Sequence, residues 1–382
     1  MMNYYQLKRD IIDYAHSIGI DDIGFTSAEP FEELRPKLEE YYAKGYDSGF
    51  EVGTIDERIN PKLSLPSAQS IIAIAVGYPN KLKDAPRSTK NERRGIFARA
   101  SWGQDYHTLL NDRLNKLEAY IKRRVPEAEC MNMVDTGVLS DRAVAERAGL
   151  GFTGRNGFVI NPKLGTWTYL GEMLINLPFP SDNPIIDSCG DCTICVDRCP
   201  TGALLGEGGL DSKKCISFQT QLKGMMDVHY RKKIGNRLYG CDTCQQVCPL
   251  NKGINTTHED IEVEPDVVKP LLIPLLRMSN REFKETYGHL AGAWRGKKPI
   301  QRNAMIALAN FKDDSAIPEL KKVISEDVRP MIVATAYWAI AEIEGVSSIE
   351  FIERALHKET EQIVLDELND ILNTLRREQY AD

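Results

Sequence analysis

The sequence has no long apolar run, few histidines and no excess of positive charge. Its longest uninterrupted apolar segment, 71–76, is much shorter than the roughly 20 residues that span a bilayer, so no membrane helix is expected. Segment 1–9 is polar and lacks the apolar region of a secretory signal, which predicts a cytoplasmic protein. The net charge of −7 by itself argues weakly against nucleic-acid binding.

The composition is that of a soluble protein with a sizeable core. The chain has 382 residues, which corresponds to two or three domains at about 150 residues each. It is 42% hydrophobic and 27% charged, and this balance excludes collagen, a coiled coil or disorder as the dominant state.

Nine cysteines are more than a reducing compartment explains by chance, and eight of them lie within 189–248. The first group has the spacing C-x2-C-x2-C-x3-C-P, and the second has C-x2-C-x3-C-P with one further cysteine upstream. This is the bacterial ferredoxin pattern, in which the cysteine before proline ligates the other cluster. The crossed assignment places Cys189, Cys192, Cys195 and Cys248 on one 4Fe-4S cluster, and Cys199, Cys215, Cys241 and Cys244 on the other.

Two other uses of these cysteines are weaker. Disulfides conflict with a cytoplasmic location. Zinc ribbons use paired C-x2-C knuckles and need no third cysteine followed by x3-C-P. Segment 216–240 then becomes an insertion beside the clusters, and Cys130 a small apolar side chain.

The first 180 residues alternate helical and strand patterns, which favours an α/β layered domain. Helices are expected at 4–18, 31–44, 106–124 and 141–148, the last with Ser140 as N-cap, and strands at 20–26, 70–77, 130–134, 158–161 and 166–176. The glycines Gly149, Gly151 and Gly154 match a dinucleotide-binding spacing. They follow a helix and precede a strand, so a helix C-cap and a turn are favoured over NAD binding.

Asp135 and a basic segment are candidate ligand contacts. Asp135 ends a predicted strand, where open α/β sheets place ligand chemistry, although a turn or capping role is equally compatible with the local sequence. Segment 87–102 interleaves basic residues with Phe97 and Trp102, a pattern that suits an anionic ligand or RNA better than a solvated loop.

The last third of the chain contains a helical repeat with an offset of 32 residues. Ala304, Ala307 and Ala309 recur as alanines, and Ile317 and its apolar neighbours recur at the same offset. Such units stack into a HEAT-like array with a curved binding surface, and 361–376 is expected to cap it.

The charge is concentrated in three basic windows, 81–99, 213–237 and 281–302. They carry +5, +6 and +4, so the rest of the chain carries −22. A single basic run is usually a solvated face, but three of them favour contact with a polyanion such as RNA.

The chain resembles the epoxyqueuosine reductases, cobalamin-dependent iron–sulfur enzymes of queuosine tRNA modification. The resemblance covers essentially the whole chain and is carried by the two cysteine groups and by segments 92–103, 133–152, 234–251 and 279–304. Reductive dehalogenases, which pair cobalamin with two clusters, are more distantly similar. A dehalogenase-like reaction on a small molecule is therefore the alternative function, and an electron carrier or cobalamin chaperone leaves the repeats and basic windows unexplained.

The resemblance implies that the enzyme reduces epoxyqueuosine to queuosine at the tRNA wobble position, the last step of queuosine biosynthesis. It implies base-off cobalamin, two 4Fe-4S clusters, a tRNA anticodon stem-loop as partner, an unidentified electron donor and a monomer. Asp135 matches the proposed proton donor, whose pKa burial would have to raise. The cobalamin contacts implied are Arg58, Ala98, Asp135, Ser217, Cys241 and Asp242. The phosphate contacts expected are Lys223, Arg295, Lys297, Lys298 and Arg302.

The predicted fold class is thus an α+β or α/β multi-domain protein. The three domains expected are a cobalamin-binding α/β domain at 1–180, a ferredoxin-like two-cluster domain at 181–255, and a linker with HEAT-like repeats at 256–382. No histidine motif for a lower cobalt ligand is readable among only six histidines.

Overall fold

The computed structural model describes residues 2–380, and the chain forms two compact units. The first unit comprises the chain up to Lys81, Arg99–Cys215 and Asp242–Glu262; the second comprises Leu82–Ala98, Ile216–Cys241 and the chain from Val263 onward. Each unit is assembled from three separate pieces of the sequence. The division into three functional domains therefore stays a prediction.

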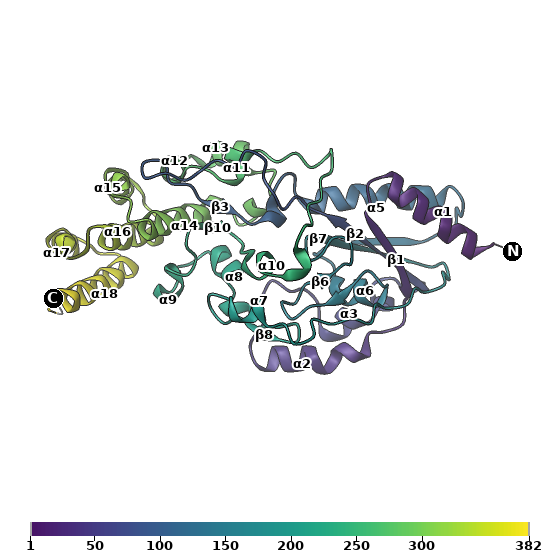
Figure 1. The fold of residues 1–382 in the computed structure, drawn as a ribbon. Coiled ribbons are helices and arrows are strands. Elements are labelled where there is room, and N and C mark those ends of the chain that lie inside the picture. Colours follow the sequence, from purple (N-terminus) through teal and green to yellow (C-terminus); the bar gives the residue numbers. More distant parts are fainter. Residues whose placement is uncertain (1, 381–382) are drawn as a thin grey trace. The chain divides into compact units, whose positions relative to one another are not determined.

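The first unit is built on a four-stranded sheet (Figure 1). Its order is β1-β2-β7-β4, from strands Asp22–Ser27, Ser70–Gly77, Thr168–Ile175 and Cys130–Met133, and every neighbouring pair is antiparallel. The strands occur where the sequence predicts them. The antiparallel order means that the sheet has no switch point of the doubly wound type, so that analogy does not explain the position of Asp135.

Helices cover both faces of this sheet, which explains why every residue of β2 is buried. On one face, α1 (Tyr4–Ser17) and α5 (Tyr106–Lys122) pack on Ile72, Ile74 and Val76. On the other face, α6 (Asp141–Arg147) packs on Ile71, Ala73 and Ala75. The continuous apolar run of β2 thus reflects an antiparallel strand that is covered on both sides.

Shorter elements complete the first unit. The helices are α2 (Arg35–Ala43), α3 (Ile55–Ile59), α4 (Pro61–Ser64), α7 (Ile194–Asp197), α10 (Thr243–Gln246) and the 3-10 turns η1 (Glu32–Leu34), η2 (Arg99–Ser101), η3 (Ser212–Lys214) and η4 (Pro249–Asn251). Two hairpins join β5 (Phe152–Thr153) to β6 (Val159–Ile160) and β8 (Leu204–Gly206) to β9 (Gly209–Leu210). Gly149 has φ +78° directly after α6 and precedes β5, which confirms the predicted C-cap and turn.

The second unit is mainly helical. Its parallel strand pair is β3 (Ile96–Phe97) with β10 (Arg237–Tyr239). The helices before the repeats are α8 (Ile216–Gln221), α9 (Val228–Arg231), α11 (Pro265–Val268), α12 (Leu272–Arg277), α13 (Asn280–Tyr287) and η5 (Ala291–Ala293). The repeats are α14 (Lys297–Asn310), η6 (Asp314–Ala316), α15 (Ile317–Glu326), α16 (Pro330–Glu344), η7 (Gly345–Ser348) and α17 (Ile349–Leu356), followed by α18 (Gln362–Gln379).

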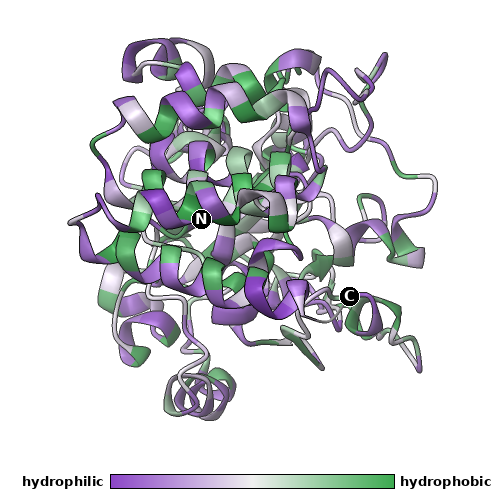
Figure 2. Cartoon of the chain, turned by 90° about the vertical axis from the view of Figure 1, so that its left-hand side faces the viewer, coloured by the Kyte–Doolittle hydropathy of each residue, from purple (hydrophilic) through white to green (hydrophobic). Residues whose placement is uncertain are grey.

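The 32-residue offset is confirmed, because the pair α14 and α15 recurs as α16 and α17. Helices α14, α16 and α18 contact one another in succession (Figure 1). Among the described residues, the stretch Pro330–Leu356 is long and apolar enough to cross a membrane by length and composition alone, although the sequence predicts no membrane helix. Most of it is buried inside the repeat, where a soluble core explains its composition equally well. The helices carry hydrophilic and hydrophobic residues side by side (Figure 2).

Candidate active site and cofactor sites

Asp135 lies at the turn that follows strand β4. It is one of four non-glycine residues with positive φ among the described residues, at +54°, and its side chain is 61% exposed. Aspartate tolerates this left-handed backbone better than most residues, but the conformation needs support from its surroundings. The turn presents a carboxylate to solvent or to a ligand.

Side chains from the start of α5 surround the Asp135 carboxylate. The hydroxyl of Tyr106 donates to Oδ2 of Asp135 at 2.8 Å, and Nε2 of His107 lies 3.4 Å from the same oxygen. Nδ1 of His107 is 2.7 Å from Oδ1 of Asp105, whose carboxylate also caps α5. Tyr106 stacks on Tyr169 of β7 with ring centroids 4.9 Å apart, which fixes the direction of its hydroxyl.

The neighbours of Asp135 favour its ionised form. His107 and then Tyr106 hold the pKa of Asp135 below its usual range, although burial acts in the opposite direction. A raised pKa of Asp135, which requires burial against a bound corrin, remains a prediction. The carboxylates of Asp105 and Asp135 raise the pKa of His107 to about 9. At neutral pH the proton of this group is therefore on the imidazole and not on Asp135.

Two further carboxyl groups lie behind the Asp135 turn. Oδ2 of Asp141 accepts the backbone N–H of Asp135 at 3.1 Å, and Asp141 contacts Glu172 of β7. Ser140 occupies the predicted N-cap position of α6, but its side chain makes no capping hydrogen bond.

Arg58 lies on α3, whose N-terminal side borders the Asp135 turn. A Cβ at Gly53 would come within 3.0 Å of Val138, so the segment before α3 packs closely on the turn. The guanidinium of Arg58 donates to the carbonyl of Val52 at 3.3 Å, while its Nε is buried without a hydrogen-bond partner. A buried donor without a partner fits a missing polar group such as a cofactor substituent.

The short helices that carry two of the predicted cluster cysteines lie side by side in the first unit. Helices α7 and α10, which carry Cys195 and Cys244, contact each other. Burial raises the pKa of Cys248, and the Cys189 and Cys192 thiols add to the effect, which places Cys248 beside the first cysteine group. All nine cysteines are free thiols. Four free thiols are the donors that a 4Fe-4S cluster requires, and the assignment of one cluster to Cys189, Cys192, Cys195 and Cys248 remains a prediction.

Backbone N–H groups point at the sulfur atoms, as cluster-binding loops require. The N–H of Arg155 lies 3.4 Å from Sγ of Cys189, and the N–H of Ala203 lies 3.3 Å from Sγ of Cys199. Burial opposes ionisation of Cys199, but the backbone N–H groups of Thr201, Leu204 and Ala203 outweigh it and lower the pKa of its thiol. Cys130 is half-buried against the apolar core between the sheet and helices α1 and α5, and burial raises the pKa of its thiol to about 11.

The remaining predicted cofactor contacts fall in both units. In the second unit, Ala98 follows β3 and donates its N–H to Tyr239 at 2.8 Å, and a Cβ at Gly240 would come within 2.5 Å of the Ala98 methyl group. Ser217 lies in α8. In the first unit, the Asp242 carboxylate is 6% exposed and pairs with Arg99 at 2.8 Å. Its side chain is thus already engaged within the protein.

Four of the five predicted phosphate contacts reach the surface of the second unit. Lys223 is exposed, and Arg295, Lys297 and Lys298 are half-buried. Nε of Arg295 donates to the carbonyl of Gln221 at 3.1 Å, and Nζ of Lys297 donates to the carbonyl of Met278 at 2.6 Å. These contacts hold the cationic side chains in place at the start of α14.

Arg302 is a correction, because its side chain is completely buried. Its guanidinium donates to the carbonyls of Leu222 at 2.8 Å, Gly224 at 2.6 Å and Gln219 at 2.9 Å, within the insertion between the cysteine groups. An arginine satisfied in this way cannot reach a phosphate. It attaches the insertion to the repeat helix α14 instead.

The aromatic residues of segment 87–102 are a second correction. Phe97 and Trp102 are buried, so they do not form a surface for RNA. Phe97 stacks on Tyr287 with centroids 5.7 Å apart, and Arg99 lies over Trp102 at 5.3 Å. The interleaving of cations and aromatics reflects packing in each unit.

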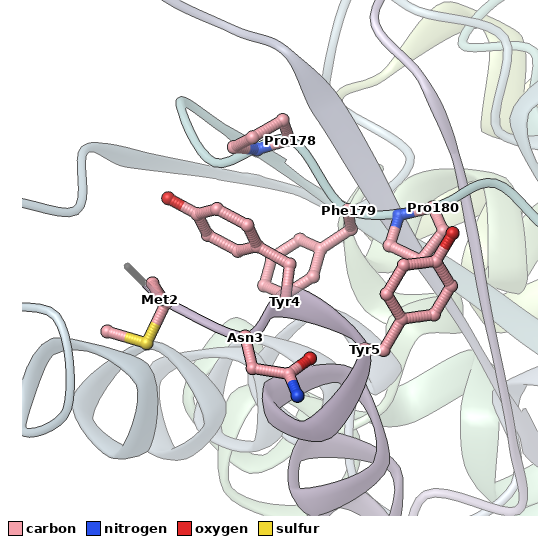
Figure 3. A pocket seen from close by; sticks show the side chains of 7 residues that line it. All are labelled: Met2, Asn3, Tyr4, Tyr5, Pro178, Phe179 and Pro180. Atoms are coloured by element: carbon pink, nitrogen blue, oxygen red, sulfur yellow. The ribbon is translucent and has the colours of Figure 1, made fainter.

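A pocket of about 500 Å³ opens between the N-terminus of α1 and the segment after β7 (Figure 3). It is lined by Met2, Asn3, Tyr4, Tyr5, Pro178, Phe179 and Pro180. Tyr4 and Phe179 meet edge to face in its wall. It contains none of the predicted site residues, and we assign no chemistry to it.

Known proteins resemble this chain over most of its length. A family model described as "Epoxyqueuosine reductase QueG, DUF1730" matches residues 58–136, a 4Fe-4S double cluster binding domain matches 188–251, and HEAT repeats match 295–371. An epoxyqueuosine reductase of Staphylococcus aureus is 69% identical and covers 94% of each chain. The chain belongs to the epoxyqueuosine reductase family.

Solved structures of epoxyqueuosine reductases have the same fold. One holds a tRNA-Tyr stem-loop modified with epoxyqueuosine; it is 54% identical, with a TM-score of 0.95 over 98% of this chain and 100% of that one. A Bacillus subtilis epoxyqueuosine reductase, solved with its catalytic aspartate loop swung out of the active site, has a TM-score of 0.94 and 53% identity over 97% and 99%. The two-cluster domain and the HEAT-like repeats predicted from the sequence are therefore confirmed.

Sequence reasoning missed the partners of Asp135. His107 and Tyr106 lie almost 30 residues before Asp135 and are brought to it because α5 packs beside β7 and β4. The only local signal is Asp105 at the N-cap, which places His107 in the first turn of α5. Trp294, 53% exposed inside a basic window, was also missed, and its Nε1 donates to Gln221 at 2.9 Å.

Proposed function

We propose that this protein reduces epoxyqueuosine in tRNA to queuosine, the last step of queuosine biosynthesis. The observation that carries the proposal is the Asp105–His107–Asp135 group, an exposed carboxylate beside an imidazole that holds a proton at neutral pH. This group lies in a chain that matches epoxyqueuosine reductases from end to end. Those relatives also leave the dehalogenase-like alternative without an observation in its favour.

The reaction has a simple balance. An epoxide becomes an alkene when it takes up two electrons and two protons and releases its oxygen as water. Two 4Fe-4S clusters would pass electrons singly from an external donor. Cobalamin, which we propose is bound base-off, would supply a cobalt centre that is a strong nucleophile when reduced, and the residues proposed to hold it are Arg58, Ala98, Asp135, Ser217, Cys241 and Asp242. The second cluster is assigned to Cys199, Cys215, Cys241 and Cys244.

The residues near Asp135 supply one of the two protons that the departing oxygen takes up to leave as water, and the solvent supplies the other. An alkoxide is a poor leaving group, so its release needs a general acid. His107 holds the proton at Nε2, 3.4 Å from Oδ2 of Asp135, and the Asp135 carboxyl carries it to the substrate oxygen. Tyr106, whose hydroxyl donates to the same oxygen at 2.8 Å, orients the carboxyl during the transfer. This route needs no elevated pKa of Asp135 in the resting enzyme.

The second unit supplies the tRNA surface in this proposal. Lys223, Arg295, Lys297 and Lys298 are the residues proposed to contact phosphates of an anticodon stem-loop, and the exposed indole of Trp294 suits an unpaired base. A relative has been solved with such a stem-loop. We further propose a cytoplasmic monomer that receives electrons from a donor whose identity is unknown.

Anaerobic reconstitution tests the function directly. The purified protein is loaded with iron, sulfide and cobalamin, reduced chemically, and incubated with tRNA from cells that lack the reductase; nucleosides are then measured by mass spectrometry. Queuosine should appear with the native protein and not with Asp135→Asn loaded to the same iron and cobalamin content. Unchanged epoxyqueuosine with the fully loaded native protein would refute the proposal.

A further inference from the structure

Glu172 is a carboxylic acid in the middle of a sheet. It lies on β7, 1% exposed, with Ala73 of β2 and Met133 of β4 as its neighbours in register. Ala73, Met133 and Leu174 belong to the apolar core under α6, and strand alternation places Glu172 on that same face. The Oε1 atom of Glu172 has no hydrogen-bond partner. An ionised carboxylate is strongly disfavoured in such surroundings.

The polar neighbour of Glu172 is Asp141, which lies in the first turn of α6. Two carboxyl groups in contact cannot both be ionised, so the pair must hold a proton. Asp141 accepts the backbone N–H of Asp135, and an acceptor in this position is best ionised. Glu172, the more deeply buried of the two, is the member that keeps the proton and donates it to Asp141.

Several elements pack around Glu172 and Asp141, and each contributes its own neighbouring groups. Strands β2 and β4 contribute Ala73 and Met133, which do not titrate. The turn after β4 contributes the Asp135 carboxylate, with His107 of α5 beyond it. On α6, the charge of Arg142 interacts with Asp141. No cation forms an ion pair with Glu172 among residues 2–380.

We propose that Glu172 is a positioning residue for Asp135: in its protonated form it donates to Asp141, whose carboxylate then holds the Asp135 turn by its backbone N–H. This inference rests on the proposed function, in which the Asp135 carboxyl carries the proton. The left-handed backbone of Asp135 needs such an external hold. A relative has been solved with its catalytic aspartate loop swung out, so a second position of this loop exists in the family.

The pKa shifts of Glu172 and Asp141 agree with a proton held between the two carboxyl groups. Burial first, and then the charge of Asp141, raise the pKa of Glu172 well above its usual range. Burial first, and then the charge of Asp135, raise the pKa of Asp141. An acid whose pKa is raised in the folded state binds more protons there than in the unfolded state. The protein therefore loses stability as the pH rises above the ordinary pKa of glutamate.

Two substitutions separate the roles of the Glu172 proton and of its bulk. Glu172→Gln keeps a donor toward Asp141 and removes the titration, whereas Glu172→Met keeps the volume and removes the donor. The matched control is Leu174→Ala, which damages the same core two residues further along β7. All are made in the full-length protein loaded with both clusters.

The first measurement is the melting temperature between pH 5 and pH 9. The gain of Glu172→Gln over the native protein should be small at pH 5 and should grow by several degrees toward pH 9. The loss in Leu174→Ala should be the same at every pH. A difference between Glu172→Gln and the native protein that does not change with pH would show that Glu172 is not the protonated group and would overturn the inference.

The second measurement is amide hydrogen exchange in the peptide 133–140, and it does not depend on activity. Glu172→Met should raise exchange at Asp135 at least tenfold, and Glu172→Gln should restore protection. In turnover, Glu172→Met should lower kcat at least tenfold with KM for tRNA within twofold, and Glu172→Gln should recover most of this loss. Equal protection in Glu172→Met and the native protein would overturn the positioning role, whereas absence of queuosine with the native protein would refute the proposed function alone.

Discussion

The Asp135 group of the first unit and the Arg302 group of the second are both clusters of charged and polar side chains, but they differ in exposure. The Asp135 carboxylate is 61% exposed and held by neighbouring side chains. Arg302 is fully buried, and its guanidinium is satisfied by main-chain carbonyls. The Asp135 carboxylate therefore remains available to a ligand, whereas the Arg302 guanidinium is fully used in hydrogen bonds within the protein.

The difference in exposure between Asp135 and Arg302 shows that the type of a residue alone does not tell whether it contacts a ligand or stabilises the fold. In the sequence, both residues stand in segments that resemble the same enzyme family, and both are predicted to meet the substrate. A cation surrounded by carbonyl groups contributes to stability because its removal leaves those carbonyls buried and without donors. A carboxylate that keeps an accessible oxygen beside a protonated imidazole can instead take part in chemistry.

The largest effect is expected at Asp135. Asp135→Asn removes the group that carries the proton while preserving its size, so kcat should fall by about 10²–10⁴-fold. Binding of tRNA should change less than twofold. The control is Asp112→Asn, an exposed acid of α5 paired with Lys116, which should leave kcat unchanged. A fall of less than tenfold, measured by queuosine formation at equal cofactor loading, would remove Asp135 from the proton path.

At Arg302 the expected loss is in stability. Arg302→Met leaves the carbonyls of the insertion without a buried donor, and the free energy of unfolding should fall by about 3 kcal/mol or more, because each buried group left without its partner costs about 1–3 kcal/mol. Arg281→Met, at an 87% exposed site, should change it by less than about 0.5 kcal/mol. Denaturant unfolding measures both. If the salt dependence of tRNA binding decreases in Arg302→Met while stability is kept, the side chain contacts phosphate after all.

Local pattern was sufficient for most elements of the fold. Strand β2 begins and ends at the predicted residues 70 and 77, because an unbroken apolar run between polar segments allows few alternatives. The repeats followed from their offset, because each unit buries the same alanine face. The order of the strands in the sheet did not follow from the sequence, because the pairing of β7 with both β2 and β4 depends on contacts between residues about 40 or more positions apart.

Spacing alone predicts the two-cluster domain, and the match to a 4Fe-4S double cluster binding domain over 188–251 agrees with it, while the ligand set of each cluster remains a prediction. Burial, by contrast, is a property of the assembled unit: Arg302 follows Lys297 and Lys298 in a basic run, yet its side chain faces inward from α14. The direction of the Asp135 pKa depends on His107, which no local motif connects to it.

The charge on His107 gives a pH test of the exposed cluster. Its pKa is raised to about 9, so its pairing with Asp105 and Asp135 stabilises the protein below about pH 6.5 and this stabilisation disappears as pH rises through 9. In the proposed route kcat should therefore fall above about pH 9. His107→Gln should lower kcat by about 10–100-fold and flatten this alkaline limb. A limb that persists unchanged in His107→Gln would assign the titration to another group.

The smallest effect is expected at Lys223, which tests whether the second unit also has charge available to a ligand. Lys223 is exposed, and the carbonyls of its neighbours Leu222 and Gly224 accept hydrogen bonds from Arg302, which fixes the backbone at this position. One phosphate contact by Lys223 would release about one counterion from the tRNA. Lys223→Ala should weaken tRNA binding about two- to fivefold and reduce the slope of log Kd against log salt by about 0.7–0.9. Lys358→Ala, an exposed lysine outside the basic windows, should leave the slope unchanged. Equal slopes for Lys223→Ala and the native protein, in titrations from low to moderate salt, would mean that the insertion is held in place for a purpose other than phosphate contact at this residue.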